Sequence, residues 1–275
     1  MKYLSSKNLF LVLWLFPLVG ILVIGSPSVH AQDKGPVAKS IQNQIDALQT
    51  RIATLEAKLQ YVKAEGTDVI FEGCNVHVRN GLGHTWGTPH GRVPKVNHLG
   101  NLIVGYNENA PPWEENPEGY QKPDRSGSHN LVIGSAHSYP SYGGLVTGVH
   151  NTVTGEFASV TGGSGNTAFG YSSSISGGNG NITMGYSSSI SSGSGNTTSG
   201  LASNVSGGLG NIASGYSSSV SGGTSNIASG YASSVTGGSG NTASGLASSV
   251  SGGLMQGASD TYDWRTRSYF QDKTN

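Results

Sequence analysis

The chain has 275 residues, of which 43 are glycine, and 15 Lys+Arg balance 15 Asp+Glu to give a formal net charge of zero. This balance gives no electrostatic basis for binding nucleic acid or an anionic membrane. A glycine share more than twice the usual value of roughly 7% argues against a conventional globular enzyme. The charge is also unevenly distributed, because residues 157–259 contain no Asp, Glu, Lys, Arg or His.

Residues 1–31 have the pattern of an export signal. Lys2 and Lys7 precede an apolar run from Leu9 to Ile24, and Val29-His30-Ala31 is typical of a signal-peptidase site. The alternative is an uncleaved anchor, although the apolar run is slightly short for a membrane-spanning helix. We predict bacterial-type export, removal of the signal with no membrane span after it, and a mature chain that is secreted or at the cell surface.

Residues 36–65 are predicted to form a short coiled coil, with Pro36 at its start and Gly66 as its stop signal. Arg51 and Glu56 fit a pattern typical of short trimeric coiled coils, in which they pair between chains. Ile and Leu alternation alone would favour two strands, and a single amphipathic helix is a further alternative. We prefer a homotrimer, with an apolar seam spaced alternately by four and three residues: Ile41, Ile45, Leu48, Ile52, Leu55, Leu59 and Val62.

Residues 67–144 form an irregular β region that begins with an expected strand at 69–79. This strand would place Ile70, Cys74, Val76 and Val78 on one face, so that Cys74 is a buried thiol. A disulfide within the chain is excluded because Cys74 is the single cysteine, whereas pairing with another chain remains an alternative.

Two segments of this region, 101–105 and 130–134, are interpreted as early, more apolar coils of the repeat that follows. The insertion between them, residues 106–127, is either a solvated loop or a binding loop. Its candidate contact residues are Trp113, Glu114, Glu115 and Tyr120. The scattered histidines lack metal-ligand spacing, and no catalytic motif is present, so no metal, no cofactor and no enzymatic activity are expected.

Residues 145–259 repeat every fifteen residues, with an approximate unit Tyr-Ser-Ser-Ser-Val-Ser-Gly-Gly-x-Gly-Asn-x-Ala-Ser-Gly. A period this short predicts a solenoid with two brief strands in each coil and glycine turns. A disordered Gly/Ser linker is the alternative, but a linker has no reason to keep one apolar residue in register. The fold class is therefore mainly β, a β-roll or solenoid of fifteen-residue repeats after a helical coiled coil, with residues 260–275 as a tail. Four columns keep the register: an aromatic or leucine column from Tyr171 to Leu246, a Val/Ile column from Val160 to Val250, an Asn column from Asn151 to Asn241 and a Gly column from Gly155 to Gly245.

One apolar residue per coil leaves a lone rod poorly covered, so rods are expected to pack side by side. The column that would face a neighbouring rod contains Thr167, Ile182, Thr197, Ile212, Ile227 and Thr242.

The register of Ser-Val-Ser-Gly-Gly and Asn-Thr-Ala-Ser-Gly over about Leu145–Ala258 resembles the left-handed β-roll head of trimeric autotransporter adhesins, the YadA-like heads. The resemblance implies a trimeric head that binds host matrix or other surfaces. In that family a coiled-coil stalk follows the head and leads to an outer-membrane barrel. Here the coiled coil precedes the repeat and the tail is too short for barrel strands, so anchoring by an own barrel is not expected.

Three classes of function follow from these expectations. The first is a secreted or cell-surface, adhesin-like structural or binding protein without catalysis, whose partners are its own copies and an extracellular surface, matrix or glycan. The second is a fibre or spike component of a larger extracellular assembly. The third is an ice-binding or glycan-binding solenoid, ranked last because the candidate columns mix Thr with Ile and Ala.

Overall fold

The computed structural model describes residues 35–86, 95–109 and 122–266. The predicted signal at 1–31, the candidate contact residues Trp113, Glu114, Glu115 and Tyr120, and the end of the predicted tail lie outside the described residues. The chain divides into two compact units at Asn75/Val76, and each unit is described by itself.

The first unit is one helix followed by a hairpin. The helix α1 (Pro36–Leu59) begins after Gly35 with a proline in its first turn, where the missing N–H costs nothing. Strands β1 (Val62–Glu65) and β2 (Asp68–Phe71) pair antiparallel, and Gly66 takes a φ of 62° in the turn between them.

The predicted coiled coil over 36–65 is therefore too long at its C-terminal end. Val62 pairs with Phe71 in the hairpin instead of closing the helical seam. The β-branched and aromatic residues on both sides of Gly66 favour the paired strands, whose hydrogen bonds replace those of a further helical turn.

The strand predicted over 69–79 and the buried Cys74 are also wrong. β2 ends at Phe71, and Gly73 then takes a φ of 71°, which an extended strand does not use. Cys74 is exposed, and so are Val76 and Val78. No sheet continues to this point, so the apolar alternation has nothing to pack against within the described chain.

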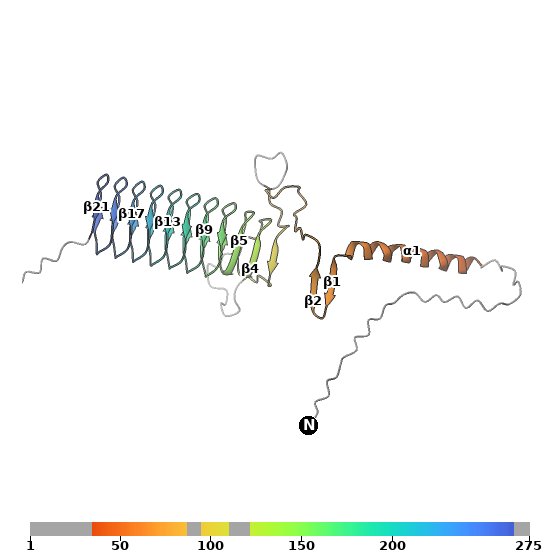
Figure 1. Ribbon diagram of the computed structural model, residues 1–275. Coiled ribbons are helices and arrows are strands. Elements are labelled where there is room, and N and C mark those ends of the chain that lie inside the picture. Colours follow the sequence, from red (N-terminus) through yellow and green to blue (C-terminus); the bar gives the residue numbers. More distant parts are fainter. Residues whose placement is uncertain (1–34, 87–94, 110–121, 267–275) are drawn as a thin grey trace, which may run out of the picture. The chain divides into compact units, whose positions relative to one another are not determined.

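The second unit is a solenoid of two parallel sheets that stack coil upon coil, as Figure 1 shows. Partners in neighbouring coils of the repeat lie fifteen residues apart, for example Ile182 with Thr197 and Ile190 with Val205. This confirms the predicted mainly β solenoid of fifteen-residue turns after an N-terminal helix.

The first sheet contains eight strands, each of two residues. Its strands are β6 (Thr152–Val153), β8 (Thr167–Ala168), β10 (Ile182–Thr183), β12 (Thr197–Thr198), β14 (Ile212–Ala213), β16 (Ile227–Ala228), β18 (Thr242–Ala243) and β20 (Gly257–Ala258).

The second sheet contains eleven strands, and its first three are longer than the rest. Its strands are β3 (Leu102–Val104), β4 (Leu131–Ser135), β5 (Leu145–Val149), β7 (Ser159–Val160), β9 (Ser174–Ile175), β11 (Ser189–Ile190), β13 (Asn204–Val205), β15 (Ser219–Val220), β17 (Ser234–Val235), β19 (Ser249–Val250) and β21 (Trp264–Arg265).

At one end of the solenoid the structure agrees with the sequence prediction, and at the other end it does not. Parallel pairing of Leu102 with Leu131, and of Leu131 with Leu145, confirms that 101–105 and 130–134 are early coils. The predicted boundary at 259 is wrong, because β21 adds one more strand that pairs with β19. Tyr262 has a positive φ of 57°, and Ser172 and Ser187 have a positive φ at the equivalent turn position of their own coils. The backbone conformation of the repeat therefore continues through this coil, although its side chains differ.

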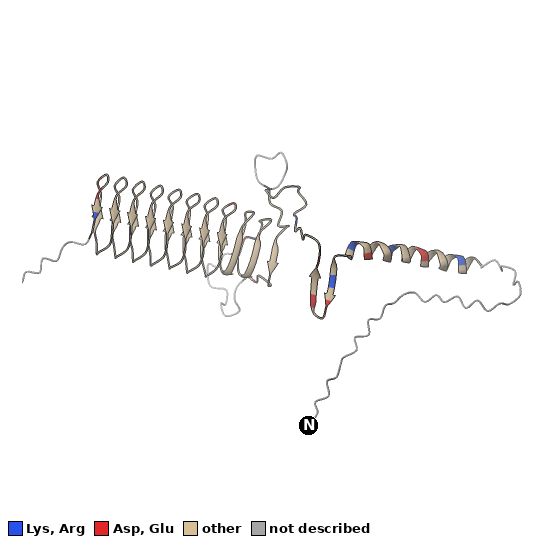
Figure 2. Cartoon of the chain, in the orientation of Figure 1, with Lys and Arg blue, Asp and Glu red and all other residues tan. Residues whose placement is uncertain are grey.

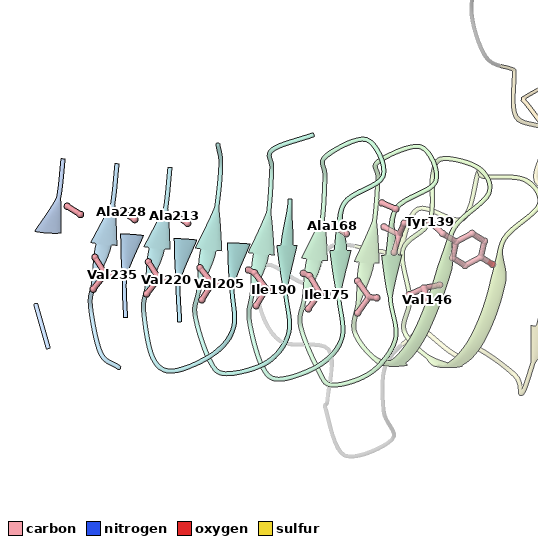
Figure 3. Close-up of a cluster of buried hydrophobic side chains, with 14 of the residues drawn as sticks. Tyr139, Val146, Ala168, Ile175, Ile190, Val205, Ala213, Val220, Ala228 and Val235 are labelled. Atoms are coloured by element: carbon pink, nitrogen blue, oxygen red, sulfur yellow. The ribbon is translucent and has the colours of Figure 1, made fainter. Parts of the chain in front are cut away.

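The core is a single file of small apolar side chains between the two sheets. The strands of the eleven-stranded sheet from β4 to β19 each direct a Val or Ile inward, and the strands of the other sheet direct mostly an Ala (Figure 3). Ala168, Ile175, Val205 and Ala213 are all fully buried. The inward positions of the eight-stranded sheet that are not Ala hold Val153, Thr183 and Thr198, so the core stays filled by small side chains throughout.

A ladder of buried asparagine side chains joins the coils. We call the residues Asn151, Asn166, Asn181, Asn196, Asn211, Asn226 and Asn241 the asparagine ladder. In each coil after the first, the backbone N–H of the ladder residue donates to the Oδ1 of the asparagine one coil earlier, at 2.8–3.0 Å. The Nδ2 of Asn211 donates to the carbonyls of Gly207 at 2.9 Å and Gly223 at 3.0 Å, and the other ladder residues repeat this pattern.

The coils approach so closely that one turn accepts no side chain. A Cβ built on Gly200 would collide with the carbonyl oxygen of Gly215 in the next coil, and the same holds along the glycine column. The column seen in the sequence is thus set by contact between stacked backbones.

We expect Asn211→Ala to destabilise the solenoid by about 3 kcal/mol or more. The substitution removes three hydrogen bonds and leaves the buried N–H of Asn226 without an acceptor, and each buried unsatisfied group costs about 1–3 kcal/mol. Asn204→Ala is the matched control, because Asn204 lies on the outer side of β13 and its amide donates only to Ser189 Oγ. Urea unfolding followed by circular dichroism measures both, and equal losses would contradict the role of the ladder.

Candidate functional site

Helix α1 carries an apolar seam that nothing in the described chain covers. The helix has no buried residue, and its six seam side chains are 42–55% exposed. They recur at spacings of four and three, so they lie on one face over about 27 Å of helix. These six are Ile41, Ile45, Leu48, Ile52, Leu55 and Leu59.

Arg51 and Glu56, which flank the seam, form no ion pair with each other within the described residues. The ion pairs found there include Lys63–Glu72 and Arg265–Asp263. Arg51 and Glu56 therefore keep their charges available to a neighbouring helix. Figure 2 shows charged residues on α1, on the hairpin and at the β21 end, while the strands of the solenoid before β21 carry none.

The outer surfaces of the solenoid differ in chemistry. On the eleven-stranded sheet, the outward residues from Ser159 to Ser249 are Ser, apart from Asn204. On the eight-stranded sheet, they are the Thr/Ile column predicted to face a neighbouring rod, and these side chains are mostly half-buried. Contacts made by these two sheet faces thus depend on hydroxyl groups and aliphatic groups.

The turn between the two sheets carries the aromatic and leucine column. The rings of Tyr171 and Tyr186 stack with centroids 5.5 Å apart, and those of Tyr216 and Tyr231 stack at 4.9 Å with an interplanar angle of 2°. Each stacked pair covers one face of each ring, and the four tyrosines are 40–61% exposed.

The described ends of the insertion 106–127 are fixed to the coil that contains β4. The carbonyl of Glu108 accepts from Ala136 N at 2.8 Å and from Arg125 Nη2 at 3.1 Å. The N–H of Tyr139 donates to the carbonyl of Asp124 at 2.7 Å, and Asn107 Oδ1 accepts from His137 N at 3.1 Å. The loop is thus held at both ends, and the binding role predicted for its central residues remains a prediction.

His137 occupies the ladder position one coil before Asn151. Its Nδ1 accepts from Asn151 N at 3.3 Å, and its Nε2 donates to the carbonyl of Ile133 at 3.1 Å, as the ladder amides donate to the carbonyl four residues earlier. The ring is fully buried, and this burial lowers the pKa of His137, with His150 lowering it further against the effect of the backbone hydrogen bonds. A protonated ring could not accept from Asn151, so the neutral form is part of the fold.

The described residues contain no cluster of three or more His, Cys, Asp or Glu side chains able to hold a metal ion. Within the same ranges, no helix is both long and apolar enough to span a bilayer. A scan against protein-family models and a search of curated proteins each gave no match.

We expect the unfolding free energy to fall as the pH is lowered from about 6.5 towards the depressed pKa of His137. The unfolded chain takes up the proton first, because an unperturbed histidine titrates near 6.5, and the slope approaches about 1.4 kcal/mol per pH unit. Denaturant melts at pH 5, 6 and 7.5 measure this dependence.

His137→Asn is the matched variant, since asparagine keeps both ladder contacts and does not titrate. The difference between the pH slopes of the two proteins isolates His137 from the other histidines. Identical slopes would show that His137 is not the group that links protonation to unfolding.

Proposed function

We propose that this chain is an exported, non-catalytic, adhesin-like protein of the cell surface or extracellular space, which trimerises through α1 and presents its solenoid as a rod. The exposed apolar seam of α1 carries this proposal. The function would be the contact of the assembled rods with an extracellular surface, matrix or glycan.

The state of α1 supports self-association. A helix of 24 residues with no buried side chain gains little from tertiary packing, and isolated helices are marginal in water. Its seam follows a heptad pattern, in which Ile45, Ile52 and Leu59 occupy one position and Ile41, Leu48 and Leu55 the other. Burying such a seam against identical helices is the simplest way to stabilise it.

The proposed number of three rests on Arg51 and Glu56. Arg51 precedes Ile52 at a flanking heptad position and Glu56 follows Leu55 at the opposite one, so that the two can pair between neighbouring helices. Neither is paired with the other in the single chain. The resemblance of the repeat to YadA-like heads, which are trimeric, supports the same number.

The solenoid suits a projecting rod more than a catalytic scaffold. Its repeats contain no ionisable group other than tyrosine between Phe157 and Ser259, so they offer no acid, base or charged nucleophile. Recognition is then expected where the repeat is interrupted, which makes the insertion 106–127 the first candidate for surface contact.

Light scattering on the mature chain from Gln32 tests the assembly. We expect a trimer at micromolar concentration, and we expect the double variant Ile45→Lys, Ile52→Lys to be monomeric because it places charges in the seam. Asn43→Lys, Thr50→Lys is the matched control, because these positions lie opposite the seam and should keep the trimer. A monomeric wild-type chain would contradict the proposed assembly.

The same proteins test the adhesive role. Binding to surfaces coated with extracellular matrix should fall at least tenfold in the monomeric variant, because three linked weak contacts bind far more tightly than one. The control variant should bind like the wild type. Trimers that adhere to no matrix or glycan surface would contradict the adhesive role and leave the assembly standing.

A further inference from the structure

The second unit contains a cavity of about 530 Å³ near the start of the solenoid. It is formed by the segment 79–86 together with His129, which precedes β4. This volume lies within the range of small-ligand sites and accommodates one or two sugar rings. Neither the repeat nor the insertion 106–127 contributes to its described lining.

His129 holds the two ends of this segment together. Its Nδ1 donates to the carbonyl of Thr85 at 3.0 Å, and its Nε2 accepts from the backbone N–H of Asn80 at 3.4 Å. Two more bonds fix Asn80, whose Oδ1 accepts from Leu82 N at 2.9 Å and whose carbonyl accepts from Asn97 Nδ2 at 2.7 Å. The cavity wall is therefore organised before any ligand arrives.

The described lining contains cationic and aromatic groups and no carboxylate. Arg79 is exposed and is not part of the ion pairs found in the described ranges. Trp86 is 46% exposed, and its ring lies 5.3 Å from that of His84. The Nδ2 of Asn80 is buried and has no hydrogen-bond partner among the described residues.

This combination selects for one kind of ligand. A planar guanidinium binds a carboxylate or sulfate with two parallel hydrogen bonds, which a single ammonium group cannot do. An exposed indole face packs against the C–H groups of a sugar ring, as aromatic residues do with other flat apolar surfaces. Metal ions and amines find no anionic partner in the described lining.

We propose that this cavity binds an acidic monosaccharide unit, a uronic acid or a sulfated sugar, with Arg79 on the anionic group and Trp86 on the ring. The inference rests on the proposed function, because a protein that contacts extracellular surfaces meets such sugars there. It assigns the recognition of charge to Arg79, since Arg79 is the Lys or Arg side chain in the described lining of the cavity.

Calorimetric titration of the mature wild-type protein tests the proposal with three probes of one ring. These are methyl glucuronide, methyl glucoside 6-sulfate and the neutral methyl glucoside. We expect at least one acidic probe to bind at least tenfold more tightly than the neutral one, and the tighter acid identifies carboxylate or sulfate as the natural group. Equal affinity for all three probes, or binding of none, would overturn the proposal.

Substitutions in the lining test whether the probe binds in the cavity. Arg79→Ala and Trp86→Ala should each weaken the acidic probe at least tenfold, and Arg79→Lys should give an intermediate loss because it keeps the charge without the paired donors. Trp264→Ala is the control for tryptophan, since Trp264 lies on β21 at the other end of the solenoid. Unchanged affinity in a folded Arg79→Ala protein would contradict the assignment.

The free-sugar titration is independent of surface adhesion. Trimers that adhere to surfaces while the probes fail to bind would refute the cavity and keep the proposed function. Binding of an acidic probe by a protein that adheres to no surface would support the cavity and refute the proposed function.

Discussion

The hydrogen bonds of the asparagine ladder are the interaction on which the solenoid depends. Most strands of the repeat have only two residues, and each coil buries one Val or Ile and one small residue, so apolar burial alone is slight. Each ladder side chain ties two neighbouring coils together, because it accepts from the next coil and donates to carbonyls in its own coil and the next. The close stacking that makes these bonds possible also excludes any side chain from the glycine column.

A structure held together in this way separates its scaffold from its recognition elements. The repeat has to keep Asn, Gly and Val/Ile at fixed places, and its outer positions between Phe157 and Ser259 carry uncharged hydroxyl, aliphatic and aromatic groups. Charged residues are therefore found where the repeat stops: on α1, around Arg79, and in the sequence of the insertion 106–127. The first ladder position shows the same principle, because His137 keeps the ladder contacts and adds a titratable group.

The sequence predicted the solenoid, its period, its two strands per coil and its early coils, because these follow from columns that recur without a gap. It also predicted the seam of α1 up to Leu59. It failed at Val62 and Cys74, where an apolar alternation continues while Gly66 and Gly73 turn the backbone. It failed again at Trp264, because that coil keeps the backbone conformation and loses the repeat residues.

The roles of two features were also not predictable from the sequence. The asparagine column was visible, but its function depends on which side of the strand faces inward, and the serine-rich pattern does not decide this. The cavity joins Asn80 to His129 across 49 residues, and scattered histidines gave no local signal for it. The role of His137 could have been predicted from the sequence, because His137 precedes Asn151 by one coil of fourteen residues and so falls in the ladder column.

Amide hydrogen exchange by NMR on the folded protein tests the central role of the ladder most directly. The account predicts that the backbone amides of Asn181, Asn196 and Asn211, which donate to buried side-chain oxygens, exchange at least a hundredfold more slowly than the turn amides of Gly177 and Gly222, which have no backbone acceptor among the described residues. Their protection should also decrease towards both ends of the solenoid. Exchange of the ladder amides at the rate of the turn amides would contradict the account.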